Sequence, residues 1–203
     1  MPTSHPFRYF AHPHEFSTYE AGPQTCALCG TEGPGYRGPF YGTRRGIKFV
    51  CEGCLASGAL ESAGLSTNDL DRRAVVEQLR ALHPGHATEE ITALANERTA
   101  ELAHRTPHVI TWRDFFWPAH CGDYMCFAKE VGQPEISLLA RDGDGPRFFA
   151  SHAVGIEGLM HGREVWEGIR PDVPENARIA SSIGVYLFRC LTCDAITLLW
   201  DCD

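Results

Sequence analysis

Four cysteines in the first part of the chain have the spacing of a metal site. Cys26 and Cys29 form one Cys-X-X-Cys pair, and Cys51 and Cys54 form a second pair after residues 30–50. In such a turn two thiolates face the same point, and a second pair brought opposite by an antiparallel hairpin completes a tetrahedron of sulfur around Zn²⁺. The spacing therefore predicts a structural zinc site, in which four protein ligands leave no open position for water or substrate.

Two disulfide bonds or a pair of redox dithiols are the alternative interpretations. Redox Cys-X-X-Cys motifs usually occur singly, after a strand in a βαβ unit, and no such pattern precedes Cys26.

The first residues have neither a basic segment nor an apolar run, and no stretch approaches membrane-spanning length. We therefore expect a cytoplasmic protein without a membrane segment, in which the nine cysteines stay reduced.

A third Cys-X-X-Cys pair lies near the C-terminus but supplies only two ligands. Its members are Cys190 and Cys193. Cys121 and Cys126 could complete a second zinc site, with His120 as an alternative ligand and with Asp201 and Cys202 as outside candidates. We expect one bound zinc ion, and two if these ligands meet.

His120, Cys121 and Asp123 also permit a catalytic interpretation. A Cys-His-Asp cluster could support nucleophilic catalysis with His120 as the base, or a reactive metal site. Residues adjacent in sequence do not ordinarily place a base and a nucleophile in the required geometry. We therefore assign no catalytic residue and expect no enzyme, with a metal- or thiol-dependent enzyme at these residues as the alternative.

The sequence pattern around these residues predicts an α+β fold. Residues 1–60 follow the order knuckle, strands, knuckle of a zinc-ribbon-like β module, with a strand at 46–50 leading into Cys51. Apolar spacing predicts a helix over 66–82, capped at one of the positions 66–68. A second helix is predicted to start at Thr88, to bury residues as far as Leu102, and to stop before Arg105-Thr106-Pro107. These two helices form a central helical hairpin. Residues 61–203 are expected to form an α+β body that packs on the module as one compact unit.

The C-terminal part is expected to be rich in β structure. Residues 185–201 are predicted to be strand, knuckle and strand, with Tyr186, Phe188 and Cys190 alternating on one side. Residues 136–140 suit a strand and residues 153–168 an irregular helix. The pattern assigns no role to residues 141–184.

Aromatic density and charge bear on binding partners. One short stretch contains four large aromatic residues, which are Trp112, Phe115, Phe116 and Trp117. Such density is typical of a core and also of a protein-binding hot spot, with the core favoured.

Residues 106–203 contain eight basic and fourteen acidic residues of a chain with net charge −8. This charge disfavours nucleic acid and suits a basic protein partner. A zinc-ribbon nucleic-acid-binding protein is the second alternative.

Several of these motifs together resemble the CbrC family, bacterial proteins named for colicin tolerance. The motifs are Phe7 to Pro13, Gly38 to Tyr41, Cys51 to Ala59, Arg105 to Pro107, Trp112, Trp117 with His120 to Asp123, and Tyr186 to Cys193 followed by Trp200 and Asp201. The resemblance implies a zinc-dependent fold and a part in surviving bacterial toxins, without a known reaction. The expected function is thus a non-enzymatic, zinc-stabilised protein that binds another protein, as an immunity or tolerance factor against a basic nuclease-type toxin.

Overall fold

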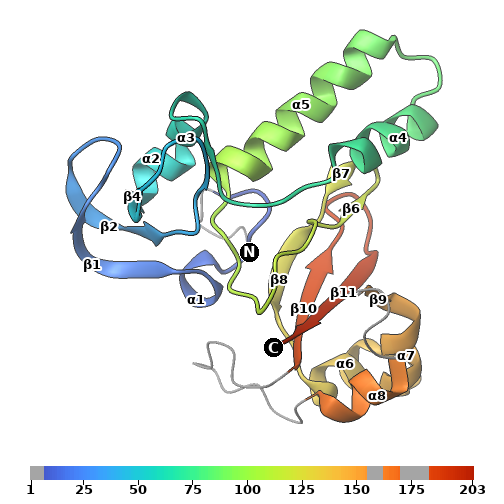
Figure 1. Cartoon of the computed structure of the whole chain (residues 1–203). Helices are drawn as coiled ribbons and strands as arrows, with labels where there is room; N and C mark the ends of the chain where they lie inside the picture. Colours follow the sequence, from blue (N-terminus) through green and yellow to red (C-terminus); the bar gives the residue numbers. More distant parts are fainter. Residues whose placement is uncertain (1–6, 155–161, 170–182) are drawn as a thin grey trace.

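The computed structural model describes residues 7–154, 162–169 and 183–203. Small β-sheets with helices packed on them confirm the expected α+β class (Figure 1). The helices are α1 (Pro13–Phe16), α2 (Glu52–Ala56), α3 (Ala59–Ser62), α4 (Arg72–Leu82), α5 (Thr88–Arg105), α6 (Gln133–Leu139), α7 (Gly145–His152) and α8 (Gly162–Gly168). The strands are β1 (Tyr19–Thr25), β2 (Glu32–Arg37), β3 (Tyr41–Gly42), β4 (Phe49–Cys51), β5 (Leu65–Ser66), β6 (Ala119–His120), β7 (Asp123–Tyr124), β8 (Cys126–Glu130), β9 (Ala153–Val154), β10 (Ile183–Arg189) and β11 (Ile196–Cys202).

An antiparallel sheet in the order β1-β2-β4 forms the N-terminal part. Tyr36 of β2 pairs with Val50 of β4, and both side chains are buried against the core. Gly35 allows the close approach of these strands, because a Cβ atom there would lie 2.3 Å from the carbonyl oxygen of Val50. The chain leaves β4 at Cys51 and enters α2 directly, so this sheet positions the second cysteine pair.

The helical hairpin is made by α4 and α5, but α4 begins later than the sequence pattern indicates. The Asp71 carboxylate caps it by accepting hydrogen bonds from the N–H groups of Arg73 at 2.9 Å and Ala74 at 3.3 Å. The predicted caps at positions 66–68 are wrong because those residues have other partners. Thr67 and Asn68 are buried and donate to the carbonyl of Thr106 after α5, at 2.5 and 3.0 Å.

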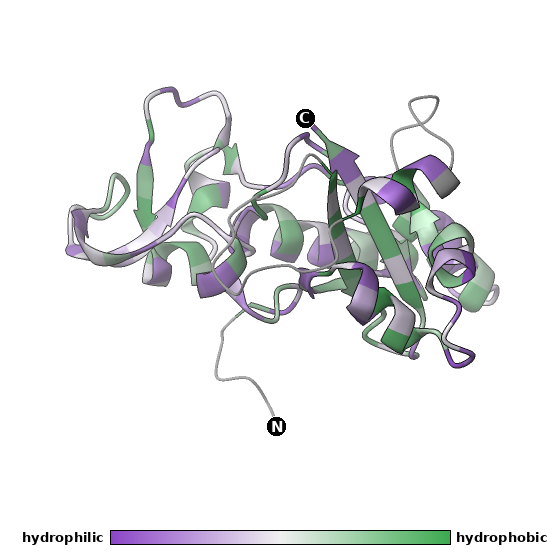
Figure 2. Cartoon of the chain, turned by 90° about the horizontal axis from the view of Figure 1, so that it is seen from below, coloured by the Kyte–Doolittle hydropathy of each residue, from purple (hydrophilic) through white to green (hydrophobic). Residues whose placement is uncertain are grey.

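A four-stranded sheet in the order β8-β10-β11-β9 forms the C-terminal part. Alternate residues of β10 enter two different cores: Tyr186 and Phe188 face one, and Val185 and Leu187 face the other. This confirms the predicted strand, knuckle and strand. Figure 2 shows the central strands of this sheet coloured largely as hydrophobic, as expected for strands covered on both faces.

Residues 136–140 are helical, so the predicted strand there is wrong. Helix α6 has a proline in its first turn, and the Glu135 carboxylate accepts a hydrogen bond from the Gly132 N–H at 2.8 Å. Ile136 is fully buried whereas Leu138 is 84% exposed, so the short apolar run covers one helix face.

The irregular helix expected over 153–168 is found only in part. Positions 153 and 154 form β9, α8 occupies 162–168, and 155–161 lie outside the described residues.

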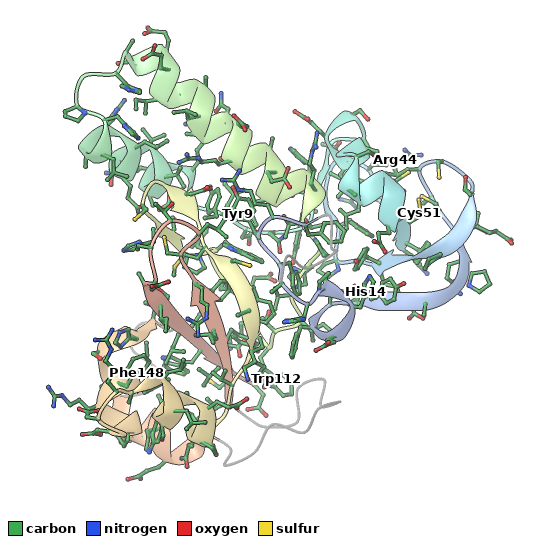
Figure 3. All side chains as sticks on the ribbon, turned by 180° about the vertical axis from the view of Figure 1, so that it is seen from behind. Tyr9, His14, Arg44, Cys51, Trp112 and Phe148 are labelled. Atoms are coloured by element: carbon green, nitrogen blue, oxygen red, sulfur yellow. The ribbon has the colours of Figure 1, made fainter. Side chains whose placement is uncertain are left out.

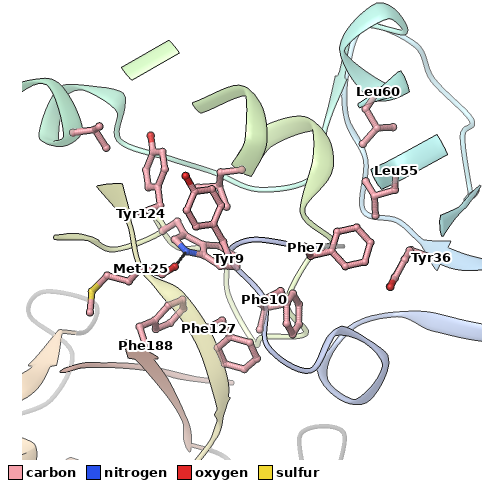
Figure 4. Close-up of a cluster of buried hydrophobic side chains, with 14 of the residues drawn as sticks. Phe7, Tyr9, Phe10, Tyr36, Leu55, Leu60, Tyr124, Met125, Phe127 and Phe188 are labelled. Atoms are coloured by element: carbon pink, nitrogen blue, oxygen red, sulfur yellow. Dashed lines mark hydrogen bonds between the residues drawn. The ribbon is translucent and has the colours of Figure 1, made fainter. Parts of the chain in front are cut away.

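One hydrophobic cluster connects the two predicted parts of the chain (Figure 4). Phe10 packs edge-to-face on Phe127, with ring centroids 5.0 Å apart. The same cluster contains Tyr36 and Leu55 from before residue 60 and Phe188 from near the C-terminus. The N-terminal sheet therefore shares a core with the rest, while the division at residue 60 stays a prediction.

Candidate metal centres

The first cysteine group lies at the edge of the N-terminal sheet. Cys26, Cys29, Cys51 and Cys54 come together so that all four sulfur atoms lie within 4.8 Å of one another. The first pair occupies the turn from β1 to β2, and the second spans the end of β4 and the start of α2. The structure thus brings together the four ligands expected for the first zinc site.

The turn that carries the first pair favours thiolate sulfur. The Cys26 N–H donates to the carbonyl of Thr31 at 2.9 Å, Gly30 has a left-handed φ of 74°, and the Leu28 N–H points to Cys26 Sγ at 3.4 Å. Hydrogen bonds from Thr31 lower the pKa of Cys29 to about 6. Since a thiolate is the form that binds metal, these donors favour a metal-binding state of the first pair, whereas burial raises the pKa of Cys51 and Cys54.

A second group joins two turns that are far apart in sequence. His120 and Cys121 come from the β6–β7 hairpin, and Cys190 and Cys193 come from the turn between β10 and β11. Their four ligand atoms also lie within 4.8 Å of one another. Cys193 Sγ is 3.7 Å from Cys121 Sγ and 3.5 Å from His120 Nδ1.

The second knuckle repeats the backbone geometry of the first. The Cys190 N–H donates to the Ala195 carbonyl at 2.9 Å, and the Thr192 N–H points to Cys190 Sγ at 3.4 Å. Burial opposes ionisation of Cys190, but hydrogen bonds from the backbone of Cys193 and Thr192 outweigh it and lower its pKa to about 7. Both groups therefore combine crowded donors with backbone N–H groups directed at sulfur.

The hairpin that presents His120 and Cys121 is strained and fixed from outside. Cys121 and Gly122 have φ angles of 53° and 73°, as a two-residue turn of type I′ requires. Among the described residues Cys121 is the only non-glycine with a positive φ. Such a backbone persists only where its surroundings hold it, and it often marks a functional site.

Two helix residues hold this hairpin. The Gln78 side chain of α4 donates to the Ala119 carbonyl at 3.0 Å and accepts from the Gly122 N–H at 2.9 Å. Arg98 of α5 donates to the Gly122 carbonyl. Sequence reasoning missed both residues, because a Gln and an Arg on an amphipathic helix give no signal of a partner more than twenty residues away.

Cys126 does not belong to the second group, although the sequence spacing favoured it as a ligand there and gave His120 as the alternative. Cys126 lies in β8 opposite Arg189, its Sγ points to the Phe127 carbonyl at 3.6 Å, and burial raises its pKa to about 11. The outside candidates Asp201 and Cys202 lie at the far end of β11 from the knuckle, because Cys202 pairs with Ile183 at the start of β10.

Asp123 has partners other than the metal-ligand group. Its carboxylate accepts hydrogen bonds from Arg8 at 2.5 Å and from the Tyr9 hydroxyl at 2.6 Å. Although His120 and Asp123 pair through their backbones, among the described residues no hydrogen bond joins the Asp123 carboxylate to the His120 imidazole, whose Nδ1 faces Cys193 instead. Asp123 therefore anchors the N-terminal segment to the hairpin and does not orient the imidazole.

Fold and site together define an α+β protein with two groups of sulfur and imidazole ligands that could hold metal ions. A model described as "Uncharacterised protein family (UPF0167)" matches residues 5–202, so the chain belongs to this family. It is 28% identical over 159 residues to UPF0167 protein PA1536 of Pseudomonas aeruginosa, covering 76% of this chain and 80% of that relative. No solved structure matches the chain.

The family match corrects the resemblance to the CbrC family, which is wrong. The motifs that suggested it were short. Their cysteine, glycine and aromatic residues form turns and pack in the core, and metal-binding folds of unrelated families use the same residue types for these purposes. Toxin tolerance loses its support with that resemblance.

Within the described ranges, no helix combines the length and apolar character that a membrane crossing requires.

Proposed function

We propose that this protein is a non-enzymatic, zinc-stabilised protein that binds another protein. The observation that carries the proposal is that each group supplies four protein ligand atoms within 4.8 Å of one another. Four protein ligands fill the tetrahedral coordination of Zn²⁺, so neither ion has an open position for water or substrate. Both centres then contribute to folding rather than to catalysis.

The chemistry of the donors favours zinc among the divalent metals. Seven of the eight donors are cysteine sulfur and one is imidazole. Soft sulfur ligands disfavour Mg²⁺ and Ca²⁺, which take oxygen, and tetrahedral sulfur and nitrogen sites are typical of Zn²⁺. The proposed ions would be Cys₄-bound at the first centre and Cys₃His-bound at the second.

Each ion would connect segments that the apolar core holds only in part. At the second centre Cys121 and Cys193 are 72 positions apart, and Cys193 is exposed to solvent. Few apolar contacts are available to an exposed turn, so a bound ion would add a constraint that the core does not supply there. The first centre similarly joins the exposed Cys29 to the end of β4.

The protein-binding part of the proposal is supported by charge and by exposed apolar residues. The chain has a net charge of −8, most of it in the half after residue 105. Phe116 is 69% exposed and Trp112 is 39% exposed in that half. Exposed aromatic side chains with acidic neighbours suit a protein partner of complementary charge.

Metal analysis of the purified full-length protein tests the proposal. We expect two zinc ions per chain, and removal by a strong chelator should produce unfolding that is detected by circular dichroism and reversed by added Zn²⁺. Cys29→Ser should lose one ion and Cys193→Ser the other. A folded protein that holds no metal would refute the metal part, and turnover that depends on Cys121 would refute the non-enzymatic part.

A further inference from the structure

A loop between α5 and β6 presents large apolar residues to solvent. We call residues 112–116 the aromatic loop; they belong to no helix or strand. Phe116 is 69% exposed, which is unusual for phenylalanine, and Trp112 is 39% exposed. Figure 3 shows Trp112 beside the four-stranded sheet, in a different part of the molecule from Cys51 of the first metal centre.

A pocket of about 240 Å³ lies beside this loop. Its apolar lining comes from Phe115 and Phe116 of the loop and from Val154, Leu199 and Trp200 of β9 and β11. Its charged lining comes from Arg113, Asp114 and Asp201. Val154 lies on the outermost strand of the sheet and is 57% exposed. Apolar area is thus gathered from the loop and from two strands around one opening, which is the form of an anchor pocket in protein interfaces.

The aromatic loop is held in place although it has no regular structure. The Asp201 carboxylate, 2% exposed, accepts hydrogen bonds from the N–H groups of Trp112 at 2.7 Å and Arg113 at 3.0 Å. The Arg113 side chain donates to the Cys202 carbonyl at 3.0 Å, and Tyr41 donates to Asp114 at 2.9 Å. The exposed rings are therefore presented by a preorganised backbone, which lowers the entropic cost of binding.

Charge indicates the occupant. Asp114 lines the pocket, and the half of the chain after residue 105 has fourteen acidic and eight basic residues. Asp201 and Arg113 line the pocket too, so two carboxylates face one guanidinium, which donates to the Cys202 carbonyl. A second copy of this chain would bring another net charge of −8 to the same surface, so repulsion disfavours self-association.

We propose that the aromatic loop, Val154 and Trp200 form a docking surface for a basic protein segment, which inserts one apolar side chain into the pocket and places Lys or Arg beside Asp114. The inference rests on the protein-binding part of the proposed function and names the partner's chemistry. A central apolar anchor with a charged rim is the usual arrangement of an interface hot spot.

Fluorescence anisotropy with three labelled synthetic peptides tests the proposal on the full-length, zinc-loaded protein. One peptide carries Leu flanked by Lys, the second replaces Leu with Ser, and the third replaces Lys with Glu. We expect binding of the first alone, weakened by added salt. Phe116→Ser should weaken it at least tenfold and Asp114→Asn severalfold. The matched control is Leu138→Ser on α6, where the side chain is 84% exposed but is not among the residues that line the pocket, and it should leave binding unchanged.

Four outcomes of the peptide and sedimentation measurements would overturn the docking surface. They are binding of no peptide, equal binding of the Glu peptide, equal affinity of the Phe116→Ser variant, and a dimer in sedimentation that Phe116→Ser dissolves, which would make a second copy the occupant. Metal content is measured on every sample, so absence of zinc refutes the proposed function separately. A physiological partner that still binds Phe116→Ser would leave protein binding intact and refute this surface alone.

Discussion

His120 and Cys126 differ in a way that a pair of variants can measure. Structural zinc sites contribute on the order of 12 kcal/mol at neutral pH, or about 3 kcal/mol for each of four ligands. His120 Nδ1 lies 3.5 Å from Cys193 Sγ within the second group, so His120→Ala should weaken zinc binding there roughly 100-fold. Cys126 is directed at the Phe127 carbonyl instead, and Cys126→Ala should leave both sites intact.

Competition with a chromophoric chelator measures this difference, and the zinc retained after dialysis is counted by mass spectrometry. The wild-type protein and Cys126→Ala should each retain two ions per chain, whereas His120→Ala should retain one under the same chelator concentration. The matched replacement by alanine separates ligand loss from a change in packing, since free cysteine packs as a small apolar residue. Loss of one ion from Cys126→Ala, or two tightly held ions in His120→Ala, would refute the assignment.

Three further predictions concern residues that support the sites and the aromatic loop. Gln78→Ala removes two hydrogen bonds of about 1 kcal/mol each from the β6–β7 hairpin. Zinc should therefore bind the second centre up to about 30-fold more weakly in the same competition, with the first centre unchanged. Asp201→Ala leaves two backbone N–H groups and the Tyr186 hydroxyl without their acceptor. The unfolding free energy measured by urea denaturation should therefore fall by about 2–4 kcal/mol. A smaller decrease for Asp201→Asn would agree with this cause. Burial lowers the pKa of His108, so as pH falls the unfolded chain binds a proton at this residue before the folded chain does. Below about pH 6.5 the unfolding free energy of the wild type should therefore decrease more than that of His108→Gln. Parallel pH profiles of the two proteins would contradict this reasoning.

Local sequence was sufficient to predict the elements whose cause is local. The pair at 26–29 lies in a turn whose backbone hydrogen bonds close within a few residues, as at Cys26 and Thr31, and the pair at 51–54 spans the junction of a strand and a helix that follow one another directly. The helix from Thr88 to Arg105 likewise follows from its own apolar spacing and acidic first turn. Each of these features is determined by residues that are neighbours in the chain.

The second centre could be predicted only in part, because its fourth ligand is chosen by distant contacts. Sequence spacing favoured a fourth sulfur, Cys126, over imidazole. The turn at Cys121 instead follows from the pairing of β6 with β7 and from Gln78 and Arg98, which hold Gly122 from two helices. These contacts direct His120 toward the cysteines, and nothing in the local pattern of residues 119–124 announces them.

Short apolar runs were the weakest basis for prediction. Residues 136–140 contain three large aliphatic residues and an alanine beside a serine, a pattern that fits a buried strand as well as a helix. The helix is selected by Glu135, whose carboxylate caps the preceding turn, and by burial of Ile136 in the core cluster to which Phe149 of α7 also belongs. Tertiary packing thus decided a choice that propensity left open.

The order in which the metal ligands occur along the chain has a consequence for synthesis. A nascent chain that has emerged as far as α3 already carries every donor of the first group, whereas the second group lacks Cys190 and Cys193 until β10 has been made. If zinc binds as proposed, the first ion can be acquired co-translationally well ahead of the second. Zinc scarcity would then produce chains with a finished N-terminal sheet and an open C-terminal sheet, and a ribosome stalled within β10 would hold the same half-loaded intermediate.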